Sequence, residues 1–204
     1  MRNIPLQIVI EDNLSLELAK KVIQNTKNNY VVDRVWPDIT RKKSTRGSGY
    51  IQVKVNAFNN AARHTPFLIL TDLDQHECAP SFVEELLKRE KEDNLFFRVA
   101  VREVESWILA DRDNFAKYIS ISPALISTNP DTLEDPKNYL FTLAKQSRKR
   151  RIREGIPPED KTARIGKEYN PLLITFVRDH WDFKEAMKRS DSLRRFVVQF
   201  DNIN

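Results

Sequence analysis

The sequence predicts an α/β fold with a mostly parallel sheet, helices on both of its faces and a helical C-terminal extension. Short β-branched or apolar runs alternate with segments whose apolar residues recur at helical spacing, between residues 7 and 118. Such alternation is typical of parallel sheets, because each right-handed crossover returns the chain to the same edge of the sheet. Beyond about Ile121 the pattern changes, and prolines divide the chain into short helices and loops.

The strands are expected at residues 7–10, 30–35, 66–71 and 95–101. Helical spacing follows each strand in turn, over residues 14–23, 53–63, 81–92 and 103–118. Asn13 or Ser15 is expected to cap the first helix. The run from Pro66 to Thr71 is the most strand-like of all and should lie inside the sheet, whereas the basic, glycine-containing stretch 41–49 predicts a loop. Residues 1–120 are therefore expected to form the α/β core and residues 121–204 a helical extension packed on it, together one structural domain.

Composition restricts the classes of function. Apolar residues make up 40% and charged residues 31% of the 204, the balance of a folded soluble protein. No stretch approaches the roughly 20 apolar residues of a membrane span, so we expect a cytoplasmic protein without a membrane partner. With Cys78 as the one cysteine and three histidines, disulfides and structural zinc are not expected, and any metal should be held by oxygen. The net charge of +5 is compatible with an anionic partner, while nothing indicates the oligomeric state.

Acidic residues follow the predicted strands at three positions: Glu11, Asp72 and Asp74. The carboxyl ends of parallel strands meet at one edge of a sheet, which is where ligands bind in such folds. Carboxylates crowded there would repel one another unless a cation neutralised them, and oxygen ligands favour Mg²⁺ or Mn²⁺. The alternative is that Asp72 and Asp74 only cap a turn and the following helix, as aspartates often do after strands.

The order of a glutamate after the first strand and an Asp-x-Asp after a later one resembles the Toprim family. The resemblance implies a Rossmann-like, Toprim-type sheet whose carboxylates, here Glu11, Asp72 and Asp74, hold one or two Mg²⁺ ions used on phosphodiesters. The family usually has a glycine directly after the first glutamate, whereas this chain has Asp12 there. The turn after the first strand should therefore differ.

A narrower resemblance, to small prokaryotic Toprim-related proteins often encoded beside an ATPase, lies in the stretch 99–111 (VAVREVESWILAD), in Trp181 and in the stretch 190–194 (SDSLR). It implies an ATPase partner and a defence or toxin-like system. It also favours Glu105, with Glu103 as a substitute, as a further carboxylate that binds the metal or orients water. The alternative for Glu105 is a surface pair with Arg102 one helical turn away. Trp107 is expected in the core.

A basic segment lies in the C-terminal part of the chain. Residues 145–153 contain six basic side chains in nine positions, namely Lys145, Arg148, Lys149, Arg150, Arg151 and Arg153. Such a run can follow a phosphate backbone, although a solvated helix face is an equally common explanation. Lys161, Arg164 and Lys167, in a loop that contains Gly166, are expected to approach a phosphate near the acidic site.

Taken together, these patterns predict a Mg²⁺-dependent phosphodiester hydrolase that acts on DNA or RNA. Glu11, Glu105 and Lys167 are the expected catalytic residues, and the other two carboxylates complete the metal site. The expected nucleic-acid-binding residues are Arg148, Lys149, Arg150, Arg151 and Arg164. Two alternatives stay open: a non-catalytic Toprim-fold subunit that regulates an ATPase partner, and an enzyme acting on a small phosphorylated substrate.

Overall fold

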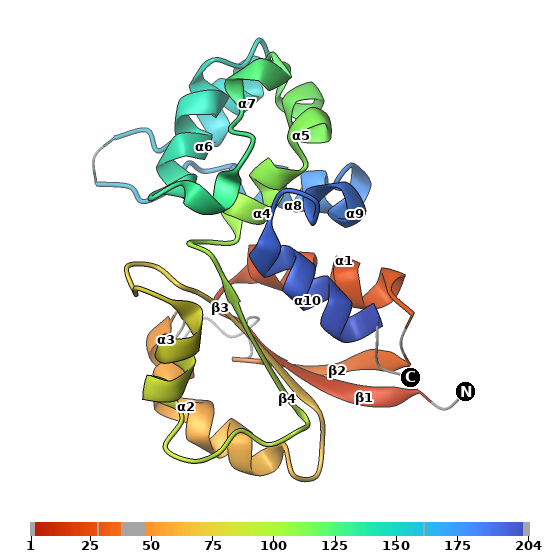
Figure 1. The fold of residues 1–204 in the computed structure, drawn as a ribbon. Coiled ribbons are helices and arrows are strands. Elements are labelled where there is room, and N and C mark those ends of the chain that lie inside the picture. The colour runs from red at the N-terminus through yellow and green to blue at the C-terminus, as the bar shows by residue number, and fades with distance from the viewer. Residues whose placement is uncertain (1–2, 28, 38–47, 161, 202–204) are drawn as a thin grey trace. The chain divides into compact units, whose positions relative to one another are not determined.

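The computed structural model describes residues 3–27, 29–37, 48–160 and 162–201. Its four strands form one all-parallel sheet in the order β2-β1-β3-β4 (Figure 1). The strands are β1 (Ile4–Val9), β2 (Tyr30–Trp36), β3 (Phe67–Asp72) and β4 (Leu95–Ala100). The α/β fold is confirmed, and β3 lies inside the sheet, between β1 and β4, as the sequence predicted.

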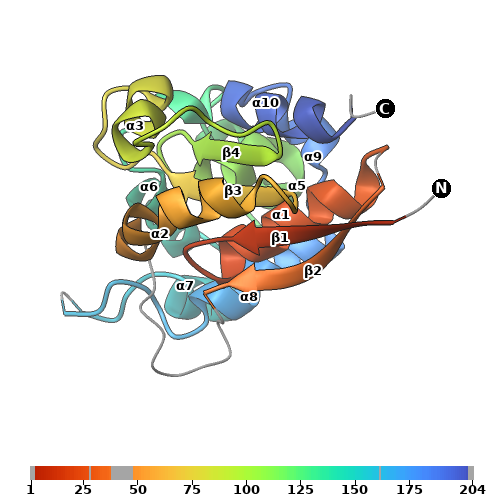
Figure 2. The same cartoon turned by 90° about the horizontal axis from the view of Figure 1, so that it is seen from below.

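Helices cover both faces of the sheet. The three that follow the first strands are α1 (Asn13–Asn25), α2 (Ser48–Ala61) and α3 (Ala79–Leu86). Alternate side chains of β3 point to opposite faces, so Phe67 and Ile69 pack in one cluster with Phe58 of α2 and Phe82 of α3. On the other face α1 contacts β2 and β3, and the end of α10 (Asp191–Asp201) packs Phe200 on Phe96 (Figures 1 and 2). The stretch 41–47, within the predicted loop, is outside the described residues, and Ser48 and Gly49 belong to α2.

Helix α3 is shorter than the sequence predicted. The apolar spacing indicated a helix over residues 81–92, but α3 ends at Leu86. Two asparagines of α2 bond to the backbone that follows. The Asn56 side chain bonds the carbonyl of Leu86 and the amide of Lys88, and Asn59 bonds the carbonyl of Glu90 and the amide of Glu92, all at 2.8 to 3.0 Å. These bonds replace those of a helix, so the charged stretch reaches β4 through bends and a turn.

We expect Asn59→Ala to lower the free energy of unfolding by about 1–3 kcal/mol, because it removes both hydrogen bonds that the buried Asn59 side chain makes to the backbone of Glu90 and Glu92. Asn59 is only 4% exposed. The matched control is Asn60→Ala on the same helix, since exposed Asn60 has only a 3.5 Å bond to Arg89 and should change stability by less than about 0.5 kcal/mol. Urea unfolding measures both. Equal effects of the two substitutions would show that the asparagine bonds do not hold this segment.

The helix predicted over residues 103–118 is two helices, α4 (Glu105–Ala110) and α5 (Arg112–Ile119). The break falls at Asp111, whose backbone leaves the helical region at φ −83° and ψ 62°. Its buried carboxylate accepts hydrogen bonds from the Asp182 amide at 2.7 Å and from the Asn114 side chain. Burial raises the pKa of the Asp111 carboxyl group, and these hydrogen bonds lower it. The sequence pattern missed the break because Asp182 is distant in the chain.

The C-terminal region is helical, as expected. It contains α6 (Pro136–Lys145), α7 (Arg150–Gly155), α8 (Tyr169–Asp179), α9 (Phe183–Ala186) and α10, with 3₁₀ turns at Pro123–Leu125 and Pro130–Thr132. The chain divides into two compact units: an α/β unit of Met1–Val101 with Phe196–Asn204, and a helical unit of Arg102–Arg195. The sequence analysis placed the boundary after residue 120. The structure divides the chain after Val101 instead, so α4 and α5 belong to the helical unit. In the described part of the chain, no helix is both long enough and apolar enough to cross a bilayer.

Three residues of the narrower resemblance, Trp107, Trp181 and Ser192, meet inside the helical unit. Trp107 is fully buried, which confirms the core position expected for it. Its indole N–H donates to the Ser192 hydroxyl at 2.7 Å, while the Trp181 indole donates to the Trp107 carbonyl at 3.1 Å. Arg189 donates to the carbonyl of Ala110 at 3.3 Å. Trp181 and Ser192 of the resemblance, together with Arg189 just before the stretch 190–194, therefore hold α4 in place.

Candidate functional site

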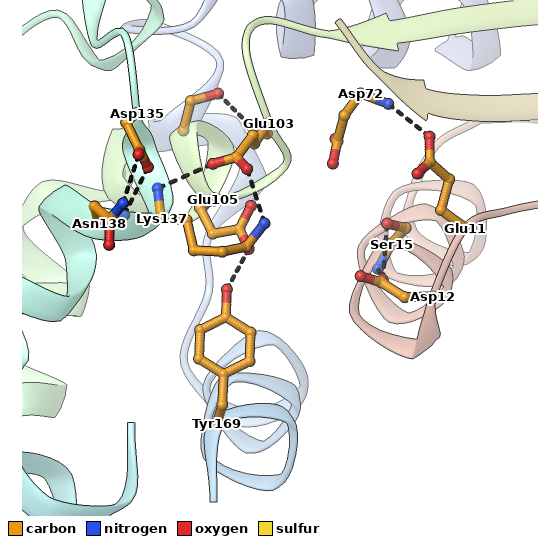
Figure 3. A network of polar contacts seen from close by, with 11 residues as sticks. Glu11, Asp12, Ser15, Asp72, Glu103, Glu105, Asp135, Lys137, Asn138 and Tyr169 are labelled. Carbon is orange, nitrogen blue, oxygen red and sulfur yellow. Dashed lines mark hydrogen bonds and ion pairs between the residues drawn. The ribbon is translucent and has the colours of Figure 1, made fainter. Parts of the chain in front are cut away.

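Two of the predicted metal ligands meet at the carboxyl edge of the sheet. β1 and β3 are parallel neighbours, with Val9 beside Ile69, so the residues that follow them lie at the same edge. The Glu11 carboxylate accepts a hydrogen bond from the Asp72 amide at 3.2 Å (Figure 3) and a second from the Thr71 hydroxyl. Glu11 and Asp72 are 61 positions apart in sequence, and the sheet brings them together.

The surroundings of Glu11 act on its protonation. Burial raises the pKa of the Glu11 carboxyl group, and the carboxylates of Asp74 and Asp12 raise it further. The hydrogen bonds from Thr71 and from the Asp72 amide lower the pKa, because they stabilise the charged form. A buried carboxylate with acidic neighbours is stabilised by a nearby cation, which makes this edge of the sheet chemically suited to one.

Asp74 occupies the turn directly after β3. Its backbone is left-handed, with φ of 50°, a conformation that aspartate tolerates better than most residues. The preceding residue anchors the turn, since Leu73 is buried and its amide donates to the Ala100 carbonyl at 2.9 Å. Asp74 itself is exposed. The structure therefore places the third predicted ligand on a defined turn at the same edge, close enough to raise the pKa of Glu11.

Asp12 stands where the Toprim family usually has glycine, and it has a structural role here. It is the N-cap of α1, and its carboxylate accepts from the Ser15 amide at 2.8 Å and from the Ser15 hydroxyl at 2.9 Å. Asn13 or Ser15 was the predicted cap. This prediction was wrong, because the cap is the residue before Asn13. A carboxylate at this place also interacts favourably with the positive end of the helix.

The donors at this edge fit a divalent cation in kind. Carboxylate oxygens are the ligands that Mg²⁺ and Mn²⁺ prefer, and each carboxylate has two oxygens, so Glu11 can accept its two hydrogen bonds and still bind an ion. Among the described residues, no three His, Cys, Asp or Glu side chains converge as a ligand set.

Glu105, the predicted supporting carboxylate, is held in a network inside the helical unit. It is 2% exposed at the start of α4, so the alternative of a surface pair with Arg102 does not describe its position. The Tyr169 hydroxyl of α8 donates to it, and the Lys137 ammonium of α6 lies 3.5 Å from the same oxygen (Figure 3). Lys137 also contacts Glu103, through its ammonium at 2.8 Å and its amide at 3.0 Å. The Lys137 ammonium thus forms ion pairs with both Glu103 and Glu105.

The basic segment is exposed but is partly bonded to its own unit. Lys145 and Arg148 are exposed, as are the other four basic side chains. Those four make local hydrogen bonds: Lys149 to the Tyr118 carbonyl at 2.7 Å, Arg150 to Glu154 at 2.9 Å, Arg151 to Glu168 at 2.6 Å and Arg153 to the Ser147 carbonyl at 2.8 Å. Exposed pairs of this kind contribute little to stability, so phosphate groups can compete for these side chains.

Arg164 and Lys167 lie near the end of the segment between α7 and α8, and Lys161 of the same predicted cluster is outside the described residues. The Lys167 ammonium is 2.9 Å from Glu159, and its side chain is 80% exposed. Arg164 is exposed as well. Arg164 and Lys167 both belong to the helical unit. Their expected approach to a phosphate near the acidic site stays a prediction.

Two glycines close the base of this loop. Gly166 donates its amide to the Ile156 carbonyl at 3.1 Å. A Cβ atom on Gly166 would lie 2.2 Å from the carbonyl oxygen of Gly155 and 2.5 Å from that of Pro157. A side chain fits at position 166 only if the backbone moves.

We therefore expect Gly166→Ala to destabilise the protein by about 1–3 kcal/mol, as overpacking does elsewhere. Gly49→Ala is the matched control, because nothing lies within 4 Å of a Cβ at that position. Its helical position even favours alanine, which is better than glycine by up to about 1 kcal/mol. Thermal melting of both variants decides: a Gly166→Ala protein that melts with the parent would show that the loop base adapts freely.

Sequence reasoning missed three residues that position the candidate site residues. Thr71 was included only as the end of a strand, although its place before Asp72-x-Asp74 was a usable signal. Lys137 and Tyr169 carried no such signal, because they come from separate helices and meet Glu105 only in the folded unit.

The fold and the site define a class of protein: an α/β protein with a four-stranded parallel sheet and acidic residues at its carboxyl edge. No family model, curated protein or solved structure matches the chain. Its function is therefore argued from these residues.

Proposed function

We propose that this chain is a divalent-metal-dependent phosphodiester hydrolase of the Toprim type that acts on DNA or RNA. One observation carries the proposal: the Glu11 carboxylate is fixed beside Asp72 at the carboxyl edge of a parallel sheet, with Asp74 on the next turn. This is the edge at which such sheets bind ligands, and the order of the three acidic residues along the chain is that of the Toprim family.

Glu11, Asp72 and Asp74 are the proposed ligands of Mg²⁺ or Mn²⁺. When bound, such an ion supplies charge stabilisation at phosphoryl oxygens and lowers the pKa of a water molecule. The Thr71 hydroxyl and the Asp72 amide hold the Glu11 carboxylate in one orientation, and their hydrogen bonds oppose the rise in its pKa that burial causes. The Asp12 carboxylate is kept at the helix cap by Ser15, which assigns it no ligand role.

The helical unit supplies the remaining proposed functions. Glu105, fixed by Tyr169 and Lys137, is proposed as the supporting carboxylate that orients water. Lys167 is the proposed catalytic cation, which offsets charge at the reacting phosphate. The proposed nucleic-acid-binding side chains are exposed: Arg148, Lys149, Arg150, Arg151 and Arg164.

The narrower resemblance suggests the setting of this activity. In this proposal the chain works in a prokaryotic defence or toxin-like system, with an ATPase as its partner. The same resemblance also supports a second function, that of a non-catalytic subunit that regulates the ATPase.

A cleavage assay tests the proposed function. The full chain is incubated with single- and double-stranded DNA and RNA in the presence of Mg²⁺, Mn²⁺ or chelator, with and without the ATPase. Cleavage that needs the metal is the expected result, because the proposed site activates water only with a bound ion. Binding without cleavage under every condition would overturn the hydrolase and leave the regulatory subunit.

We also expect nucleic-acid affinity to fall steeply with salt. Replacing Arg148, Lys149, Arg150 and Arg151 together by Gln should flatten the slope of log K against log salt by up to about 3.6 units on duplex DNA, because counterion release scales with phosphate contacts. The control removes the same charge elsewhere, at the exposed residues Lys54, Lys88, Arg89 and Lys184. Titrations at several salt concentrations measure the slope. An equal change in both proteins would reduce the basic segment to a solvated surface.

A further inference from the structure

The helical unit contains a pocket that the proposed metal site does not use. Its volume is about 620 Å³. One wall is the stretch from Thr128 to Thr132, and the other is the junction of α9 and α10 from Met187 to Arg194. Pockets of roughly 300–1,000 Å³ hold small molecules, a range that includes a mononucleotide.

Three cationic side chains line this pocket: Lys188, Arg189 and Arg194. Two of them have partners from which they can be released at low cost. Lys188 lies 2.5 Å from Glu185 in a pair whose side chains are 62% and 48% exposed, and such pairs contribute little. Arg194 shares the Asp191 carboxylate with Arg195, so Asp191 keeps one cation when Arg194 turns to a ligand.

Arg189 is the fixed cation of the three. Its side chain is 30% exposed, and one guanidinium nitrogen donates to the Ala110 carbonyl at 3.3 Å. The other contact, to the exposed Asp113, is 3.9 Å long. A guanidinium group has five N–H donors in a planar fork, so Arg189 can hold this position and still bind two oxygens of a phosphate.

The opposite wall offers uncharged donors and acceptors together with one half-buried carboxylate, Asp131. The carboxylate accepts from the Ser192 amide at 3.3 Å, and the Ser190 hydroxyl accepts from the Leu193 amide at 3.2 Å. The first amides of α10 are therefore already bonded and are not the anion site. The Oδ1 atom of Asp131 is buried and makes no hydrogen bond within the described residues, so a ligand N–H or O–H would improve its situation.

We propose that this pocket binds a phosphorylated nucleotide, with its phosphate on Lys188, Arg189 and Arg194 and its sugar or base donors toward Asn129, Thr132 and Asp131. Burial raises the pKa of the Asp131 carboxyl group, and the hydrogen bond from the Ser192 amide lowers it. The ligand is either a free mononucleotide or the phosphorylated terminal nucleotide of a strand, since both present the same groups. The site lies entirely in the helical unit and does not depend on the metal-site proposal.

Calorimetric titration of the full chain with the four common 5′-mononucleotides, the matching nucleosides and inorganic phosphate tests the site. We expect the Lys188→Gln, Arg194→Gln double variant to bind a mononucleotide at least about tenfold more weakly, since two charge-assisted bonds to the phosphate are lost. The control is Lys117→Gln, Lys184→Gln, which removes the same charge from exposed positions outside the pocket. It should bind like the parent. Thermal melting checks that both variants are folded.

A second arm identifies the source of the ligand. Short oligonucleotides with a 5′-phosphate, a 3′-phosphate or only hydroxyl ends compete with the bound mononucleotide. Stronger competition by one phosphorylated end assigns the pocket to strand ends, and competition by mononucleotides alone assigns it to a free nucleotide. No binding of any mononucleotide or phosphorylated end, or equal weakening in the control variant, would overturn the site. Because these titrations contain chelator, their outcome is independent of cleavage.

Discussion

Replacing Glu11 by Gln or Asp72 by Asn is expected to abolish metal-dependent cleavage while leaving nucleic-acid binding intact. Each substitution removes one proposed ligand charge and keeps the shape of the side chain. The loss should be on the order of 10³-fold in rate, which corresponds to about 4 kcal/mol of transition-state stabilisation. Binding measured in chelator should be equal to that of the parent or tighter, because one negative charge near the phosphate is gone.

Asp12→Asn is the matched control for this pair of variants. It removes a carboxylate adjacent to Glu11, and asparagine caps a helix about as well as aspartate, so α1 should be unaffected. We expect Asp12→Asn to cleave at nearly the parent rate. All proteins are purified identically, so that a contaminating nuclease would appear in each of them. Equal cleavage by all four proteins, or equal loss in the control, would contradict the assignment of Glu11 and Asp72.

The second large effect concerns the network around Glu105. Lys137→Met should lower the free energy of unfolding by about 3 kcal/mol, since removing the partner of a buried charge typically costs about 3–5 kcal/mol and Lys137 is partly exposed. The Lys137 ammonium lies 3.5 Å from Glu105, which is 2% exposed, and 2.8 Å from Glu103. Without the Lys137 ammonium, the negative charges of Glu103 and Glu105 lose the cation that they share. Chemical denaturation gives the value.

A double variant separates charge from packing. Adding Glu105→Gln to Lys137→Met removes the buried charge and should recover most of the lost stability, because Gln can still accept from the Tyr169 hydroxyl. Lys145→Met, at an exposed position in the last turn of the same helix, should change stability by less than about 0.5 kcal/mol. If the double variant is less stable than Lys137→Met alone, the lysine acts through packing rather than through charge.

Much of the α/β unit could be predicted from the sequence. The strands are short apolar runs, and their composition distinguishes them from the helices. Their parallel direction follows from the helices that connect them. For the same reason Glu11 and Asp72 could be placed at one edge, because residues that follow neighbouring parallel strands lie at the same edge of the sheet. The hydrogen bond between the Asp72 amide and Glu11 is the direct result.

What the sequence did not predict depends on contacts between distant segments. The helix expected over residues 81–92 stops at Leu86 because asparagines of α2 bond the backbone beyond it. The helix around Asp111 breaks because the Asp182 amide bonds to that side chain. In both cases local apolar spacing was compatible with a longer helix, and a polar partner from elsewhere in the chain decided the outcome.

The course of α10 has a consequence for any attempt to divide the chain. Residues 196–201 of this helix belong to the α/β unit, where Phe200 packs on Tyr30 and Phe96, whereas its first turn belongs to the helical unit. The helical unit is thus an insertion into the α/β unit, and neither a shortened N-terminal fragment nor a C-terminal truncation isolates a complete α/β core. A fragment ending at residue 120 would expose those aromatic rings to water. To separate the units, residues 102–195 must be excised and the last turns of α10 kept.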